Sequence, residues 1–116
     1  MNNADEILEN AVAAHRAGDA VTAVSLYRQV LAISPDNGDA LRNLATLLAT
    51  SGELEEAADL YHSALLLDPH DLAVLTNMGH ILRALGKTDE ACSLYNRVLE
   101  IAPDQTMPAF AAQLTK

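Results

Sequence analysis

Four histidines, one cysteine and a run of carboxylates are the side chains of this sequence that could bind a metal ion or act on a substrate. The histidines are His15, His62, His70 and His80, and no two of them have the i, i+4 spacing that places two metal ligands on one helix face. We expect His62 to point outward, and His70 to cap the following helix or to face water. The sequence therefore predicts no metal site and no cofactor.

The lone cysteine, Cys92, cannot form an internal disulfide or a cysteine-based metal cluster. The residues 34 and 68 positions before it are Ala58 and Val24, both small and apolar, so we expect Cys92 to be buried and unreactive. No serine or cysteine stands in a nucleophile motif, and no glycine-rich phosphate loop follows a strand. We predict that the chain has no catalytic residue and is not an enzyme.

Acidic residues dominate the charge, with 16 Asp and Glu against 7 Lys and Arg and a net charge of −9. A field of this sign repels phosphate, which argues against nucleic acid and anionic membranes as partners. Glu53, Glu55, Glu56 and Asp59 lie close together, and we interpret them as a solvated helix start rather than a cation site. No apolar run approaches the roughly 20 residues of a membrane helix, and the acidic amino terminus is unlike a secretory signal. These features predict a cytoplasmic protein.

A period of 34 residues organises the elements that must position these side chains. Four residue types keep this period through three copies: Gly18, Gly52 and Gly86; Ala23, Ala57 and Ala91; Tyr27, Tyr61 and Tyr95; Pro35, Pro69 and Pro103. All the tyrosines of the chain occupy one register. The period indicates a repeat array, in which each unit buries its apolar face against its neighbours.

Each period contains two helical patterns. Apolar residues recur with helical spacing in both halves, first in Leu41, Leu44, Ala45 and Leu48 and then in Ala57, Leu60, Tyr61, Ala64 and Leu65. Glycine ends the first helix because it tolerates a left-handed backbone, and the residue before proline ends the second. We expect Gly79 to face Ala91 so that paired helices approach closely, and each tyrosine hydroxyl to meet water or a polar partner.

This pattern resembles the tetratricopeptide repeat. The matching residues are Leu41, Leu44, Ala45, Gly52, Ala57, Tyr61, Ala64 and Pro69, with Leu75, Met78, Gly79, Gly86, Ala91, Tyr95 and Pro103. The resemblance implies an all-α fold in which helix-turn-helix repeats stack in a right-handed superhelix. The predicted repeats span residues 4–37, 38–71 and 72–105, and the first helix of the first repeat is the least apolar. Residues 106–116, with Pro108 near their start, are expected to form a capping helix or to begin a truncated fourth repeat.

In the family that the chain resembles, the first helix of each repeat lines a concave groove that binds extended peptides. The corresponding polar residues in the second and third repeats are Arg42, Asn43, Thr46, Thr76, Asn77, His80 and Arg83, and His15 belongs to this face in the first repeat. Asn43 and Asn77 resemble the asparagine ladder of O-linked N-acetylglucosamine transferase repeats, where amides pair with a peptide backbone. The alternative is that they support local packing. A terminal-carboxylate clamp is not expected, since Leu8, Val12 and Ala73 occupy three of its positions.

The resemblance thus predicts a protein-interaction scaffold whose partner is a protein or an extended peptide, anionic or neutral because Arg42 and Arg83 belong to the groove. Two alternatives are open. The chain could be the amino-terminal substrate-docking region of a larger enzyme of the glycosyl- or sulfotransferase type. It could also be a scaffold that self-associates through the ends of the array.

Overall fold

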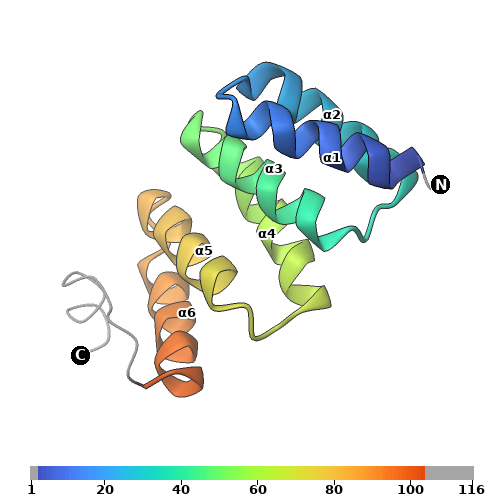
Figure 1. Ribbon diagram of the computed structural model, residues 1–116. Coiled ribbons are helices and arrows are strands. Elements are labelled where there is room, and N and C mark those ends of the chain that lie inside the picture. The colour runs from blue at the N-terminus through green and yellow to red at the C-terminus, as the bar shows by residue number, and fades with distance from the viewer. Residues whose placement is uncertain (1–2, 104–116) are drawn as a thin grey trace. The chain divides into compact units, whose positions relative to one another are not determined.

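A computed structural model describes residues 3–103, which contain six α-helices and no strand (Figure 1). The helices are α1 (Asn3–Arg16), α2 (Ala20–Ile33), α3 (Gly38–Thr50), α4 (Leu54–Leu67), α5 (Leu72–Ala84) and α6 (Thr88–Ile101). The chain divides into two compact units: unit 1, residues 1–67 with α1 to α4, and unit 2, residues 68–116 with α5 and α6. The predicted all-α class is confirmed. Within the described range, none of the helices has the length and apolarity needed to cross a membrane.

A glycine closes the turn inside each helix pair, as the sequence predicted. Gly52 has φ 88°, a left-handed conformation that strains any residue with a side chain, and Gly18 and Gly86 both have φ 82°. The Glu53 N–H donates back to the Leu48 carbonyl oxygen at 2.8 Å and so satisfies one of the last carbonyls of α3. The second helices of the pairs end two residues before a proline, at Ile33, Leu67 and Ile101.

Side-chain caps fix the start of α3 and α5, the helices that carry the predicted groove residues. The Asn37 side chain accepts a hydrogen bond from the Ala40 N–H at 3.0 Å, and the Asp71 side chain accepts one from the Val74 N–H at 3.2 Å. Asn37 and Asp71 are 34 residues apart, so the cap belongs to the repeat. Of the two roles expected for His70, the cap of α5 belongs to Asp71, and His70 is exposed to water.

In unit 1, α3 packs against both α2 and α4. This position buries six of its residues: Ala40, Leu41, Leu44, Ala45, Leu47 and Leu48. Only Ala4 and Ala11 are buried in α1, as expected of the least apolar helix. A bidentate ion pair also joins α2 to α4, in which Arg28 donates two hydrogen bonds to the Glu56 carboxylate at 2.7 and 3.2 Å.

In unit 2, the close approach of α5 and α6 depends on the missing side chain of Gly79. A Cβ at this position would lie 2.7 Å from Cε1 of the Tyr95 ring, closer than packed carbon atoms come. The three nearest atoms all belong to Tyr95, and the expectation that Gly79 faces Ala91 stays a prediction. The aromatic ring, and not a small residue, occupies the space that glycine leaves.

Unit 2 also carries an open hollow of about 360 Å³. Its apolar side chains combine with two carboxylates and a hydroxyl, and the lining residues are Met78, Leu82, Asp89, Glu90, Ser93 and Leu94. The predicted cap at residues 106–116 lies outside the described residues, so its placement over an apolar face stays a prediction. The boundaries of the three repeats, which begin and end between the helices, stay predictions as well.

Candidate functional site

The tyrosines that recur every 34 residues each reach from the second helix of a pair to a polar side chain on the first. Their rings are buried, yet the Tyr27 hydroxyl lies 3.2 Å from Nδ1 of His15 and the Tyr95 hydroxyl 2.8 Å from Nδ1 of His80. The Tyr61 hydroxyl lies 2.6 Å from Oγ1 of Thr46. The expected polar partner is confirmed. The structure adds that two of these partners, Thr46 and His80, are predicted groove residues.

The direction of the bond at Thr46 follows from its second contact. The Thr46 hydroxyl donates to the backbone carbonyl oxygen of Arg42 at 2.9 Å. A hydroxyl has one proton, so Thr46 must accept from Tyr61. The result is a short chain of hydrogen bonds from the core of unit 1 to the backbone of α3. Thr46 is thereby held in place although it is exposed.

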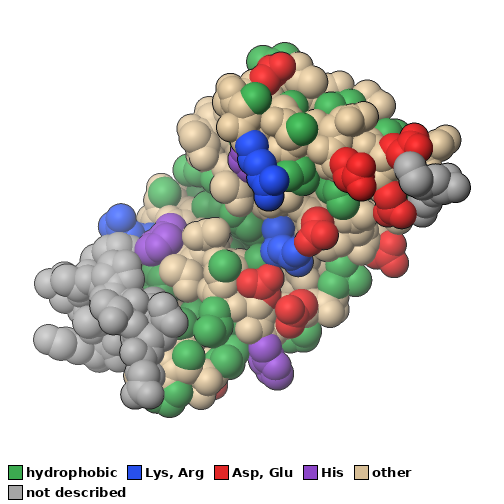
Figure 2. Space-filling view, viewed as in Figure 1, with side chains coloured by type: hydrophobic (Ala, Val, Ile, Leu, Met, Phe, Trp, Pro, Cys, Tyr) green, Lys and Arg blue, Asp and Glu red, His purple; other side chains and the backbone are tan. Residues whose placement is uncertain are grey.

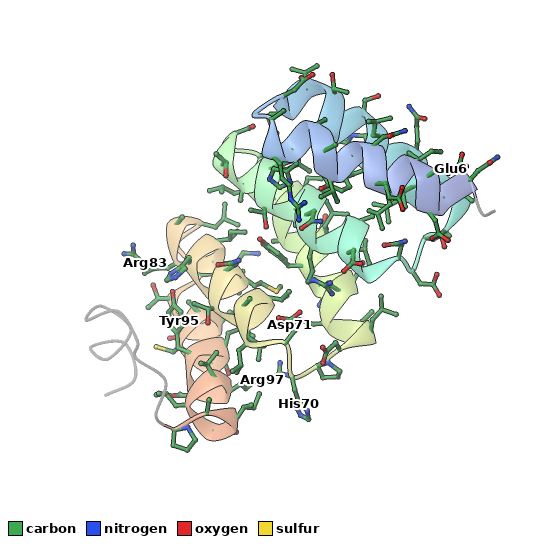
Figure 3. All side chains as sticks on the ribbon, in the orientation of Figure 1. Glu6, His70, Asp71, Arg83, Tyr95 and Arg97 are labelled. Atoms are coloured by element: carbon green, nitrogen blue, oxygen red, sulfur yellow. The ribbon has the colours of Figure 1, made fainter. Side chains whose placement is uncertain are left out.

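In unit 2, burial shifts both members of the His80–Tyr95 pair toward their neutral forms. Partial burial lowers the pKa of His80 below its ordinary value, and the positive charge of Arg83 lowers it further. Burial is also the main cause that raises the pKa of Tyr95, an effect that Arg83 opposes. A neutral imidazole can accept at Nδ1 from the tyrosine hydroxyl, so these shifts agree with the geometry. Figure 3 shows Tyr95 reaching from α6 toward α5.

In unit 1, His15 contacts the Tyr27 hydroxyl, and burial and three further side chains act on its pKa. Burial raises the pKa of Tyr27, a hydrogen bond from the Asn43 side chain opposes this rise, the negative charge of Asp39 adds to it, and the positive charge of Arg16 reduces it. His15 and Arg16 belong to α1, and Asp39 and Asn43 belong to α3. Arg16, which stands next to His15 in the last turn of α1, was missed by the sequence analysis.

The structure distributes the predicted groove residues over the two units. Arg42, Asn43 and Thr46 lie on α3 of unit 1, and Thr76, Asn77, His80 and Arg83 lie on α5 of unit 2. Thr46, Asn77 and Arg83 are exposed, and the other four are partly buried. Arg42 forms an ion pair with Asp39, three residues earlier on the same helix. A hydrogen bond from Asn43 lowers the pKa of Tyr27, and both roles that the sequence left open for Asn43 stay predictions.

The residues considered for chemistry lie apart from one another. Within residues 3–103, no three His, Cys, Asp or Glu side chains form a group that could hold a metal ion. His62 is exposed, as predicted, and so is His70. Cys92 is partly buried and not enclosed, which corrects the expectation of a fully buried thiol. The candidate site is therefore the polar surface on the first helix of each pair, where one side chain per helix bonds to a tyrosine hydroxyl of the second helix.

We expect His80 to make the stability of the protein depend on pH in the mildly acidic range. Its folded pKa lies below the ordinary value of 6.5, so the unfolded chain takes up the proton more readily as the pH falls. The contribution of neutral His80 to the free energy of unfolding is therefore complete above pH 6.5, and it is lost as the pH falls through the folded pKa of His80. Urea unfolding midpoints of wild type and His80→Gln at about pH 7.5 and about pH 5 measure this contribution.

The variant should lose less stability than wild type between the two pH values. His62→Gln is the matched control, since His62 is exposed on α4. It should keep the wild-type dependence. An equal drop in all three proteins would show that His80 does not contribute.

Comparison with known proteins gives one family match. A sequence model of the tetratricopeptide repeat matches residues 14–62 and again residues 48–114. Comparison with curated protein sequences finds no match.

Solved structures share the fold. A mutant O-GlcNAc transferase from Thermobaculum terrenum is 33% identical with a TM-score of 0.76, over 87% of this chain and 19% of that one. The Sgt2 TPR domain from Aspergillus fumigatus is 24% identical with a TM-score of 0.78, over 99% of this chain and 76% of that one. The first TPR of Spaghetti (RPAP3), bound to the HSP90 peptide SRMEEVD, is 23% identical with a TM-score of 0.81, over 95% and 85%.

The chain thus spans about a fifth of the transferase and most of the length of the two TPR domains. The family match begins in α1 and extends past α6, and the helix pairs have the fold of these domains. The glycine turns and buried tyrosines of this chain recur with the 34-residue period inside the matched range. The chain belongs to the tetratricopeptide repeat family.

Proposed function

We propose that the protein binds an extended peptide segment of a partner protein on the polar faces of α3 and α5. Tetratricopeptide repeats are in general scaffolds for protein–protein interaction and are not catalytic. The face would comprise Arg42, Asn43 and Thr46 in unit 1, and Thr76, Asn77, His80 and Arg83 in unit 2. The observation that carries the proposal is the tyrosine contact, which holds Thr46 and His80 in place on these helices.

Hydrogen-bonding capacity on these faces suits a peptide backbone. Asn43 and Asn77 each offer an amide that both donates and accepts, and Thr46 and Thr76 add hydroxyl groups. Side chains of the binding surface that are already ordered lose less entropy on binding than mobile side chains do. An extended segment would therefore meet a largely prearranged row of polar groups within each unit.

We expect the double variant Asn43→Ala and Asn77→Ala to weaken peptide binding by roughly tenfold or more, because each lost hydrogen bond to a ligand backbone has about that effect. The probe is a peptide selected against the wild-type chain from a random linear twelve-residue library. Its affinity is measured by fluorescence anisotropy, and circular dichroism melts run in parallel. Any loss of stability should stay within about 1 kcal/mol, because alanine has the higher helix propensity.

Asn96→Ala is the matched control, since Asn96 is exposed on α6, the second helix of its pair. It should bind the peptide as wild type does. Unchanged affinity in the double variant would move the binding surface elsewhere. Unchanged affinity together with a large fall in melting temperature would show that the asparagines serve packing alone.

A second candidate function is supported by the transferase similarity. The chain is 33% identical to a segment that makes up 19% of an O-GlcNAc transferase. The same repeats could therefore serve as the substrate-docking part of a larger enzyme. Sequencing the reading frame beyond Lys116 decides this, since a catalytic domain there would favour docking and a stop codon would contradict it.

A further inference from the structure

Charge is unevenly distributed between the first and second helices of the pairs. Beyond residue 9, the first helices α1, α3 and α5 carry Arg16, Arg42 and Arg83 but only one acidic residue, Asp39. The acidic residues that give the chain its charge of −9 gather elsewhere, at the start of α1, in the turns, and on α4 and α6. On α3 the charge of Arg42 is balanced by Asp39, so the local positive excess comes from Arg16 on α1 and Arg83 on α5.

In unit 1 the cationic and donor groups cluster at the Tyr27 hydroxyl. Arg16 is exposed and directly follows His15, whose Nδ1 lies 3.2 Å from the hydroxyl. Arg42, one residue before Asn43, shares its charge with Asp39. Figure 2 shows the basic side chains over the later part of α1 and over α3, and acidic ones toward the amino end of α1. The cluster thus retains an excess positive charge.

Unit 2 repeats this arrangement with fewer residues. Arg83 is exposed in the last turn of α5, three residues after His80, whose Nδ1 lies 2.8 Å from the Tyr95 hydroxyl. Residues 72–84 of α5 contain no acidic side chain. In both units, an exposed arginine in the last turn of a first helix thus stands within three residues of a histidine that contacts a tyrosine hydroxyl.

We propose that the partner segment is acidic, with Asp or Glu side chains seated beside Arg16 in unit 1 and beside Arg83 in unit 2. This inference rests on the proposed function and names the chemistry of its ligand. Arginine suits this role because its planar guanidinium can donate two parallel hydrogen bonds to one carboxylate. Side-chain carboxylates, and not a chain terminus, would be recognised, since Leu8, Val12 and Ala73 cannot form a terminal-carboxylate clamp.

The net charge of −9 does not outweigh this local attraction at physiological salt. The screening length is about 8 Å at 0.15 M salt, so the carboxylates on other helices act weakly across the molecule. A contacting guanidinium is screened much less. The net charge instead disfavours acidic segments that fail to reach the arginines, which sharpens the choice of partner.

The test selects peptides against the full 116-residue chain from a random linear library whose carboxyl ends are fused to the phage coat. We expect the selected peptides to be enriched in Asp and Glu. One of them, acetylated and amidated, is then titrated into Arg16→Gln, Arg83→Gln and Lys87→Gln. Each arginine variant should weaken binding by about two- to fivefold, and both together by more. Lys87 is exposed at the start of α6, so Lys87→Gln loses the same charge off these faces and should bind as wild type does.

The outcomes separate this inference from the proposed function. Peptides that perturb NMR signals of α3 and α5 but are neutral or basic would leave the function standing and overturn the acidic partner. Acidic peptides bound equally by all three variants would overturn the role of the arginines. If no peptide binds these helices at all, both proposals fail. Circular dichroism melts confirm that each variant is folded.

Discussion

Replacing Tyr61 by alanine is expected to destabilise the protein by roughly 3–5 kcal/mol, the usual cost of removing a large aromatic side chain from a core. The ring is 2% exposed and belongs to unit 1, where α3 packs between α2 and α4. Its loss leaves a cavity that two constrained helices cannot close. The substitution also removes the hydrogen bond to Thr46, which contributes about 1 kcal/mol. Urea unfolding followed by circular dichroism measures the change.

Two further variants separate these causes. Tyr61→Phe keeps the ring and should cost only the hydrogen-bond part. Tyr27→Ala should cost less than Tyr61→Ala, although Tyr27 is equally buried, because it packs against α1, which buries only Ala4 and Ala11. Equal losses at Tyr27 and Tyr61 would refute this ordering.

Replacing Gly79 by valine is expected to have the next largest effect, a loss of roughly 1–3 kcal/mol from overpacking. The new Cβ would stand 2.7 Å from the Tyr95 ring, and the branched methyl groups would add to the conflict. The ring cannot move freely, since its hydroxyl is held by His80. Gly79→Ala should cost less, because alanine gains about 1 kcal/mol of helix propensity over glycine.

NMR of the His80 ring adds a second observable for the Gly79 variants. If the Tyr95 ring shifts to make room, the hydrogen bond to Nδ1 of His80 should lengthen, and the imidazole signals should change. The register equivalent in unit 1 is Ala45, which already carries a Cβ. Ala45→Gly is therefore the reverse control and should also destabilise, through lost propensity. A Gly79→Val variant as stable as wild type would contradict the packing argument.

The fold could be predicted because its determinants are local and recur. Gly52 closes a turn through its own backbone conformation, and Pro69 ends a helix through its own ring, so neither depends on distant residues. The apolar stripes follow from helical spacing alone. Three copies of each signal made the assignment firm.

The candidate site was harder to predict because its contacts join different helices. Thr46 and His80 stand 15 residues before Tyr61 and Tyr95, and that constant offset was the available signal. In the first repeat the offset fails, since Val12 has no polar atom and His15 serves instead. Whether a side chain one turn away reaches a hydroxyl depends on packing, which no spacing rule contains.

Other features of the site have signals in the sequence. The pair of Asp39 and Arg42 has the i, i+3 spacing of neighbours on a helix surface. Arg16 stands in the last turn of its helix, where a cation is favoured. The partial exposure of Cys92 could not be foreseen, because small residues at its register need not be enclosed on every side.

The tyrosine contacts also bear on how such a surface can diversify. Val12, Thr46 and His80 occupy the same place in successive repeats, yet every tyrosine hydroxyl has a partner, because His15 takes over where valine cannot. Each tyrosine hydroxyl thus meets a polar side chain from the first helix, and not one particular amino acid at one position. Substitutions at that place can therefore change the polar surface of the first helices repeat by repeat. The condition is that a polar side chain on the same or a neighbouring turn still bonds to the tyrosine hydroxyl.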